Sequence, residues 1–160
     1  MSGLDQIDLK IVAELMRDAT QTVAQVADKV GLSQTPCWKR IQKLEASGVL
    51  IQRVAIADPE KLGLGLAVFV AVEAPDHTTE WRESFMRVVA GMPEVLEVYR
   101  MAGEMDYLLR VAMPDMPAFD HFYRRLTEAL PLRNVTSHFA MERMKFTTAY
   151  PLETRNCARR

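Results

Sequence analysis

The sequence predicts an α+β protein with two parts, an N-terminal winged helix-turn-helix and a C-terminal ferredoxin-like βαββαβ domain. Three observations predict this fold. Apolar residues recur at helical spacing through the first third of the chain, behind residues that cap helices. A segment rich in helix and strand breakers follows at residues 58–65. Beyond it, short apolar runs alternate with two amphipathic helical patterns, in the order of a split βαβ fold.

The bulk composition limits the possible functions. Of the 160 residues, 49% are hydrophobic and 26% charged, as in an ordinary globular protein, and the formal net charge is −1. Residues 1–57 carry seven Lys/Arg against six Asp/Glu, so a surface that binds nucleic acid must be a local concentration of charge. The N-terminus lacks a signal segment, and no run approaches the roughly 18 apolar residues of a membrane helix. A cytoplasmic protein without membrane contact is therefore expected.

Three short helices are predicted in the first third. Asp5, Thr22 and Ser33 are the expected N-caps, and Gly31 ends the second helix. The inward positions are Ile7, Ile11, Val12 and Leu15 in the first helix, Val23, Val26, Ala27 and Val30 in the second, and Cys37, Ile41 and Leu44 in the third. Cys37 is accordingly expected to be a small buried hydrophobe. It is far from Cys157, so the two cysteines suggest neither a disulfide framework nor a metal motif.

A wing and a linker are expected next. Two apolar runs, residues 49–51 and 54–56, flank the polar pair Gln52-Arg53, which suggests a two-stranded wing, although no Asn-Gly turn marks it. The predicted boundaries are residues 1–57 for the winged helix-turn-helix and 58–65 for the linker. Residues 66–150 are expected to form the second domain, and residues 151–160 a disordered tail.

The C-terminal domain is predicted from six patterns. Strands are expected at residues 66–72, 95–101 and 107–113, and a last extended segment from 135 to about 148. Helices are expected where apolar residues recur at helical spacing, at Trp81, Phe85, Val88 and Met92, and at Phe119, Phe122, Leu126 and Leu130. The two helices would cover one face of the sheet.

The most informative local pattern is the pair formed by the second and third helices, joined through Gly31-Leu32-Ser33. A helix, a tight turn and a capped helix form the layout in which the second helix enters the DNA major groove. Residues 33–44 include three cations and no acid. The alternative is a solvated helix face that happens to be basic. The candidate DNA-binding residues are Ser33, Gln34, Thr35, Trp38, Lys39, Arg40 and Lys43, with Arg53 from the wing.

These residues resemble a known family. The similarity runs through Leu4-Asp5-Gln6-Ile7-Asp8, residues 31–40 and 44–50, Asp58-Pro59, Leu62-Gly63, residues 92–95 and residues 102–109. In this order and spacing they resemble the leucine-responsive/asparagine-regulator (Lrp/AsnC) family of transcriptional regulators. The resemblance implies double-stranded DNA as a partner and homodimers that assemble further, often into octamers. It also implies that a small amino acid binds between subunits.

Residues 101–107 contain the candidate effector site. Glycine at 103 permits a close backbone approach, free N–H groups can hold a carboxylate, and Glu104 or Asp106 can hold an ammonium group. From the residues alone a plain β-hairpin is the favoured interpretation; the resemblance reverses this, because family members bind effectors at this loop. The candidate effector residues are Met101, Gly103, Glu104, Met105, Asp106, Tyr107, Thr136 and Ser137. Residues 38–40, 80–81, 100–104 and 139–142 resemble a branch whose members respond to L-cysteine.

Two other classes of function compete with a regulator. An enzyme would need a pocket with a nucleophile, a general base or metal ligands, and the widely spaced His77, His121 and His138 suggest none of these. We therefore expect no catalytic residue, no metal site and no cofactor besides an amino-acid effector. An architectural DNA-binding protein that senses no ligand stays open as the alternative to a regulator.

Overall fold

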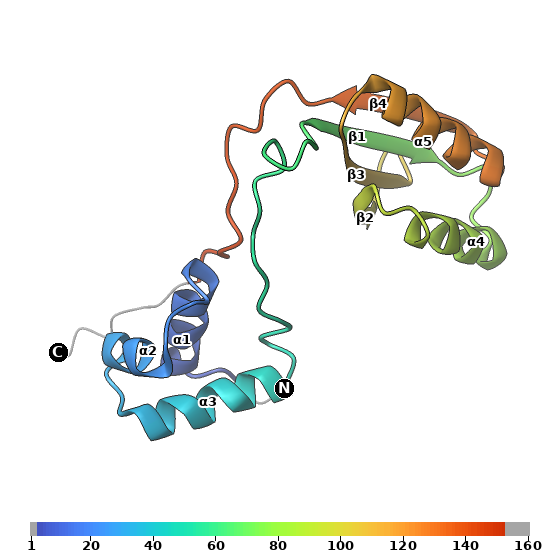
Figure 1. Ribbon diagram of the computed structural model, residues 1–160. Coiled ribbons are helices and arrows are strands. Elements are labelled where there is room, and N and C mark those ends of the chain that lie inside the picture. The colour runs from blue at the N-terminus through green and yellow to red at the C-terminus, as the bar shows by residue number, and fades with distance from the viewer. Residues whose placement is uncertain (1–2, 153–160) are drawn as a thin grey trace. The chain divides into compact units, whose positions relative to one another are not determined.

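The computed structural model describes residues 3–152. Residue contacts divide the chain into two compact units (Figure 1). One unit, called here the sheet unit, comprises residues 57–143; the other, the helical unit, joins residues 3–56 with residues 144–152. Most of the tail predicted at residues 151–160, including Cys157, lies outside the described residues.

The helical unit contains the three predicted helices, α1 (Gln6–Arg17), α2 (Val23–Val30) and α3 (Gln34–Ala46). Asp5 and Thr22 cap α1 and α2 as expected, each within a reciprocal capping box. Gly31 ends α2 with a φ of +74°, a conformation that glycine adopts at little cost. The core beneath the helices includes Val26, Cys37 and Ile41. The helix-turn-helix layout predicted from the sequence is therefore present.

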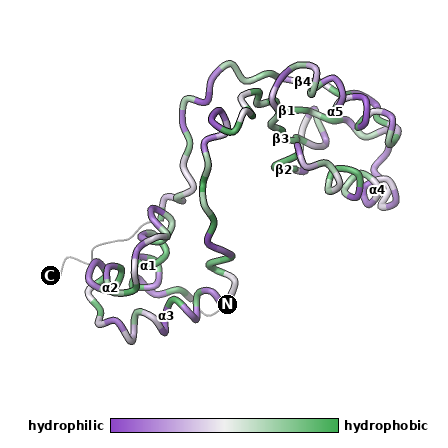
Figure 2. Tube along the Cα trace, in the orientation of Figure 1, coloured by the Kyte–Doolittle hydropathy of each residue, from purple (hydrophilic) through white to green (hydrophobic). Residues whose placement is uncertain are grey.

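The predicted two-stranded wing is wrong for this structure, because residues 51–58 contain no strand. A two-residue hairpin turn needs positive φ at one or both central residues. Among the described residues only glycines have positive φ, and neither Gln52 nor Arg53 is a glycine. The segment instead runs as a single extended stretch in which Ile51, Val54 and Ile56 are exposed, and hydrophobic residues recur along it (Figure 2).

The sheet unit has the predicted βαββαβ order. Its elements are β1 (Leu66–Glu73), α4 (Thr79–Ala90), β2 (Val95–Arg100), β3 (Tyr107–Met113), α5 (Met116–Ala129) and β4 (Asn134–Phe139). The strands lie in the order β2-β3-β1-β4, and every neighbouring pair is antiparallel. This arrangement confirms the ferredoxin-like fold.

The two faces of the sheet differ. Val68, Val70 and Val72 of β1 point towards α4 and α5, where they join Phe85 and Phe122 in a closed core. Alternate strand residues point to the opposite side of a sheet, and no element of the described sheet unit covers that side. We call this side the open face. Its residues, placed by the strand register, are Ala67, Phe69 and Ala71 of β1, Glu97 and Tyr99 of β2, Leu108, Arg110 and Ala112 of β3, and Thr136 and His138 of β4.

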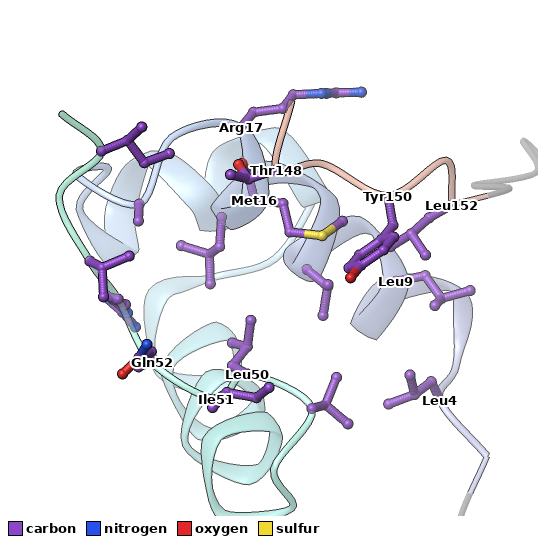
Figure 3. A pocket seen from close by; sticks show the side chains of 17 residues that line it. Leu4, Leu9, Met16, Arg17, Leu50, Ile51, Gln52, Thr148, Tyr150 and Leu152 are labelled. Carbon is purple, nitrogen blue, oxygen red and sulfur yellow. The ribbon is translucent and has the colours of Figure 1, made fainter. Parts of the chain in front are cut away.

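The last segment ends its strand pairing earlier than predicted. The extended segment was expected to reach about residue 148, but β4 ends at Phe139, and Ala140 donates the last hydrogen bond to β1, at Ala67. Beyond it, residues 144–152 rejoin the helical unit. The Thr148 hydroxyl donates to the Met16 carbonyl at 3.4 Å, and Leu152 packs against the helical core (Figure 3).

Candidate functional site

The exposed side of α3 carries most of the residues predicted to bind DNA. Cys37, Ile41 and Leu44 face the core, so the remaining positions of the helix point outward. The predicted residues that lie exposed at these positions, or at the cap before them, are Ser33, Gln34, Thr35, Trp38, Lys39 and Lys43. The Ser33 side chain makes no capping hydrogen bond, contrary to the expectation. Its hydroxyl is therefore available to a partner.

The four predicted cations differ in their surroundings. Lys39 and Lys43 form no ion pair among the described residues, and they lie four residues apart on one helix face. Arg53 pairs with Glu45 at 2.7 Å. Arg40 contacts Asp5 and Asp8 at 2.6 and 2.7 Å. Of these four cations, only the two lysines therefore present a charge that is unused within the described chain.

The core beneath α3 contains Cys37, whose side chain is fully buried. Burial raises the pKa of its thiol, because a thiolate would be left without water. The thiol therefore stays protonated near neutral pH and acts as a small apolar residue that packs α3 onto the unit, as the sequence suggested.

The candidate effector loop joins β2 to β3 at residues 101–106. It is closed by a hydrogen bond from the Met101 N–H to the Asp106 carbonyl at 2.8 Å. Gly103 has a φ of +147°, and a Cβ built there would meet nothing within 4 Å. The N–H groups of Gly103, Glu104 and Met105 make no hydrogen bond within the described structure. The loop thus offers open space beside unused backbone donors.

Asp106 has a structural role that the sequence did not reveal. Its Oδ2 accepts the N–H of Ala74 at 2.8 Å, and its own N–H donates to the Val72 carbonyl. The other oxygen, Oδ1, lies 3.8 Å from His77 Nδ1. One carboxylate oxygen of Asp106 therefore holds the loop to the end of β1, and the other faces the exposed His77 side chain.

The remaining predicted effector residues lie on different sides of the sheet. Tyr107 is buried against Trp81 and Phe85 in the core on the helix side. Thr136 pairs with Ala71 and is exposed on the open face. Ser137, the next residue, points to the helix side, where its hydroxyl is buried without a partner. Thr136 and Ser137 cannot contact one ligand on one face, because strand residues alternate.

The open face contains a polar cluster that no local sequence pattern indicates. Arg110 Nε donates to Glu97 Oε1 at 2.9 Å, and the Tyr99 hydroxyl donates to Glu97 Oε2 at 2.6 Å. The guanidinium of Arg110 and, after it, the Tyr99 hydroxyl hold the pKa of Glu97 below its ordinary value. Residues 97 and 110 lie on neighbouring strands, so the register, which the sequence does not show, brings them together.

The described residues define a class of protein. Within residues 3–152, no group of three His, Cys, Asp or Glu side chains could hold a metal ion. In the same range, no helix is long and apolar enough to cross a membrane. The features with a clear chemical use are a helix-turn-helix with a basic face on its second helix and a separate sheet unit with an open loop. A transcription regulator with a DNA-binding part and a ligand-binding part has this arrangement.

Comparison with known proteins identifies the family. The family model for the AsnC-type helix-turn-helix domain matches residues 4–45, and that for the Lrp/AsnC ligand binding domain matches residues 67–150. The chain belongs to the Lrp/AsnC family of transcriptional regulators.

Individual relatives agree with this assignment. The chain is 51% identical over 151 residues to the DNA-binding transcriptional activator DecR of Escherichia coli K12, covering 94% of this chain and 99% of that protein. A crystal structure of an AsnC family regulator from Agrobacterium tumefaciens superposes with a TM-score of 0.89 at 49% identity, covering 92% of this chain and 97% of that one. The structure of a Neisseria meningitidis regulator in complex with L-methionine also superposes with a TM-score of 0.89. The identity is 35%, covering 94% of this chain and 98% of that one. These relatives are regulators rather than enzymes.

Proposed function

We propose that this regulator binds specific double-stranded DNA sites through α3 and changes its action when a small amino acid binds between subunits of the sheet unit. The observation that carries the proposal is the outward face of α3, which presents Lys39 and Lys43 without an ion-pair partner among residues 3–152. Ser33, Gln34 and Thr35 lie exposed at the start of the same helix. In a helix-turn-helix these N-terminal positions read base edges, while lysines hold phosphates.

The effector is an α-amino acid held at the loop of residues 101–106. The unused N–H groups of residues 103–105 suit the carboxylate of such a ligand. Oδ1 of Asp106 or the carboxylate of Glu104 suits its ammonium group. The Neisseria relative that was solved with L-methionine supports an amino acid as ligand. L-cysteine is the first candidate, because the sequence resembles the cysteine-responsive branch.

A second copy of the chain covers the open face. Phe69 is 38% exposed at the middle of β1, between Ala67 and Ala71, and no described element packs on it. The apolar strip that these three residues form along β1 is stabilised when a partner removes it from water, and a symmetric dimer supplies the same strip twice. Further assembly of such dimers, up to the octamer that the family resemblance implies, would complete the site between subunits.

The effector site is tested by removing one charge while keeping the fold. We expect Asp106→Asn to lower amino-acid affinity by about tenfold or more, because the ammonium group loses a charged partner. The amide oxygen can still accept the Ala74 N–H, so the loop keeps its tie to β1. Thermal shift with each of the twenty amino acids identifies the ligand, since saturation at 100 times its Kd adds about 2.7 kcal/mol. Calorimetry then compares the variants.

Glu104→Gln is the matched control, because it removes a carboxylate from the same loop. Loss of affinity in Glu104→Gln alone would show that the ammonium group contacts Glu104 rather than Asp106. Full affinity in both variants, while the native chain responds to an amino acid, would place the site elsewhere and leave residues 101–106 as a plain hairpin.

The dimer is tested on the open face. Phe69→Glu should convert the native oligomer to a smaller species, because two like charges would meet where apolar groups pack. Light scattering at micromolar concentration measures the change. Met86→Glu on α4 is the control, because Met86 is 46% exposed against 38% for Phe69, and it should keep the native mass. A native chain that is already a monomer, or an unaffected Phe69→Glu variant, would contradict the proposed interface.

An architectural DNA-binding protein is the competing function. It would share α3 and the oligomer but would lack a ligand response. A DNA footprint that no amino acid alters, together with no thermal shift, would favour that alternative. Because the partner is DNA, we propose that the protein acts in the cytoplasm.

A further inference from the structure

Arg40 lies on α3 but turns its charge away from the exposed lysines. Its NH1 nitrogen donates to Asp5 Oδ2 at 2.6 Å and to Asp8 Oδ1 at 2.7 Å. Both carboxylates belong to the start of α1, more than thirty residues earlier in the chain. From the sequence Arg40 is a candidate DNA-binding residue, and an arginine in that role mostly holds a phosphate. In the structure its NH1 nitrogen already donates hydrogen bonds to two carboxylates.

The two carboxylates are built into the N-terminus of α1. Asp5 Oδ1 accepts the N–H groups of Ile7 and Asp8, and Asp8 Oδ2 accepts the N–H of Asp5. The Asp8 N–H and, next, the Arg40 guanidinium lower the pKa of Asp5. Asp8 is 5% exposed and is the only buried charged residue in the described chain. A buried carboxylate needs a cation close by, and Arg40 supplies it.

We propose that Arg40, Asp5 and Asp8 form an ionic clamp that sets the orientation of α3 on the helical unit, and that Arg40 is a positioning residue rather than a DNA contact. Cys37 and Ile41 hold α3 on the unit by apolar burial, which is not directional. One guanidinium held by two carboxylates is directional, so the clamp resists rotation of α3. The clamp thereby aims Gln34 and Thr35 at the bases.

The clamp and the phosphate interpretation predict opposite signs for one variant. If Arg40 contacts a phosphate, Asp8→Asn frees its charge and removes an anion near DNA, so binding tightens. If Arg40 is part of the clamp, Asp8→Asn loosens α3, and specific binding weakens although the protein has become less acidic. The proposal rests on DNA binding by α3, so a Lys39→Ala variant of the full chain is measured on the same duplexes.

The experiment uses two DNA probes, a duplex that the native chain selects from a random-sequence library and an unselected duplex of equal length. Affinities of Arg40→Ala, Arg40→Lys and Asp8→Asn are measured over a range of salt concentrations. Arg17→Ala is the control, since Arg17 is an exposed arginine whose ion pair lies within α1. Thermal melting followed by circular dichroism identifies a temperature at which every compared variant is folded, and all affinities are measured there.

We expect Arg40→Ala and Asp8→Asn to weaken binding of the selected duplex by about tenfold or more, the scale of a lost base contact. Binding of the unselected duplex and the salt slope should stay close to native, and Arg40→Lys should restore part of the loss. A slope reduced by about one unit in Arg40→Ala, or tighter binding by Asp8→Asn, would overturn the clamp. If Arg40→Ala does not fold, Asp8→Asn and Arg40→Lys decide. Unchanged binding by Lys39→Ala would instead contradict the DNA-binding face itself.

Discussion

Replacing Lys39 and Lys43 together by alanine is expected to weaken DNA binding by about two orders of magnitude at low salt. Both side chains are exposed on one face of α3 and form no ion pair in the described chain. Each phosphate contact contributes roughly 0.9 to the slope of log affinity against log salt concentration, so the double variant should lose roughly 1.8. Titration of a selected duplex at several salt concentrations measures both quantities.

Lys29→Ala is the matched control for that result. Lys29 is an exposed lysine of α2 that is held by Glu14 at 3.1 Å, so its charge is already neutralised. Its removal should change the slope little. A folded double variant of Lys39 and Lys43 with native affinity and slope would show that α3 does not face the DNA backbone.

Phe85→Ala is expected to lower the free energy of unfolding of the sheet unit by about 3–5 kcal/mol, the usual cost of deleting a fully buried ring. Phe85 stacks on Trp81 with ring centroids 5.1 Å apart, and its ring centroid lies 4.6 Å from that of Tyr107. Tyr107 directly follows the effector loop. The cavity left by the ring should therefore loosen the end of that loop as well.

Met86→Ala is the control, because Met86 lies beside Phe85 on α4 but is 46% exposed. It should change stability by much less than Phe85→Ala. Calorimetry should show that Phe85→Ala shifts the transition of the sheet unit while that of the helical unit, which has a core of its own, stays in place. An equal shift of both transitions would contradict two independent cores.

Local signals made most of the fold predictable. Asp5 and Thr22 are caps that act within one helical turn, and Gly31 was recognisable as a stop because few other residues adopt its φ. The βαββαβ order followed from the spacing of apolar residues, and the strand pairing confirms it. The prediction of a wing was wrong because it relied on two apolar runs. No residue between these runs has the positive φ that a tight hairpin turn needs.

Interactions between distant parts of the chain were not predictable. The exposed lysines of α3 were identified correctly as outward-facing from helical periodicity alone. The partners of Arg40 lie more than thirty residues away, and nothing in the local pattern distinguishes Arg40 from Lys39. Asp106 donates to and accepts from the end of β1, a contact that needs the strand register. Ser137 was grouped with Thr136 although neighbouring strand residues face opposite ways.

The return of residues 144–152 to the helical unit has a consequence for the order in which the protein folds during its synthesis. The ribosome makes α1, α2 and α3 first, yet Leu152, which packs against their core, is among the last described residues to be made. N-terminal domains generally fold before the rest of the chain is complete. Here the three helices can pack early, but the partly buried Leu152 side chain joins their core only after the whole sheet unit has been translated. A nascent regulator therefore completes its DNA-binding part only after its ligand-binding part has been made.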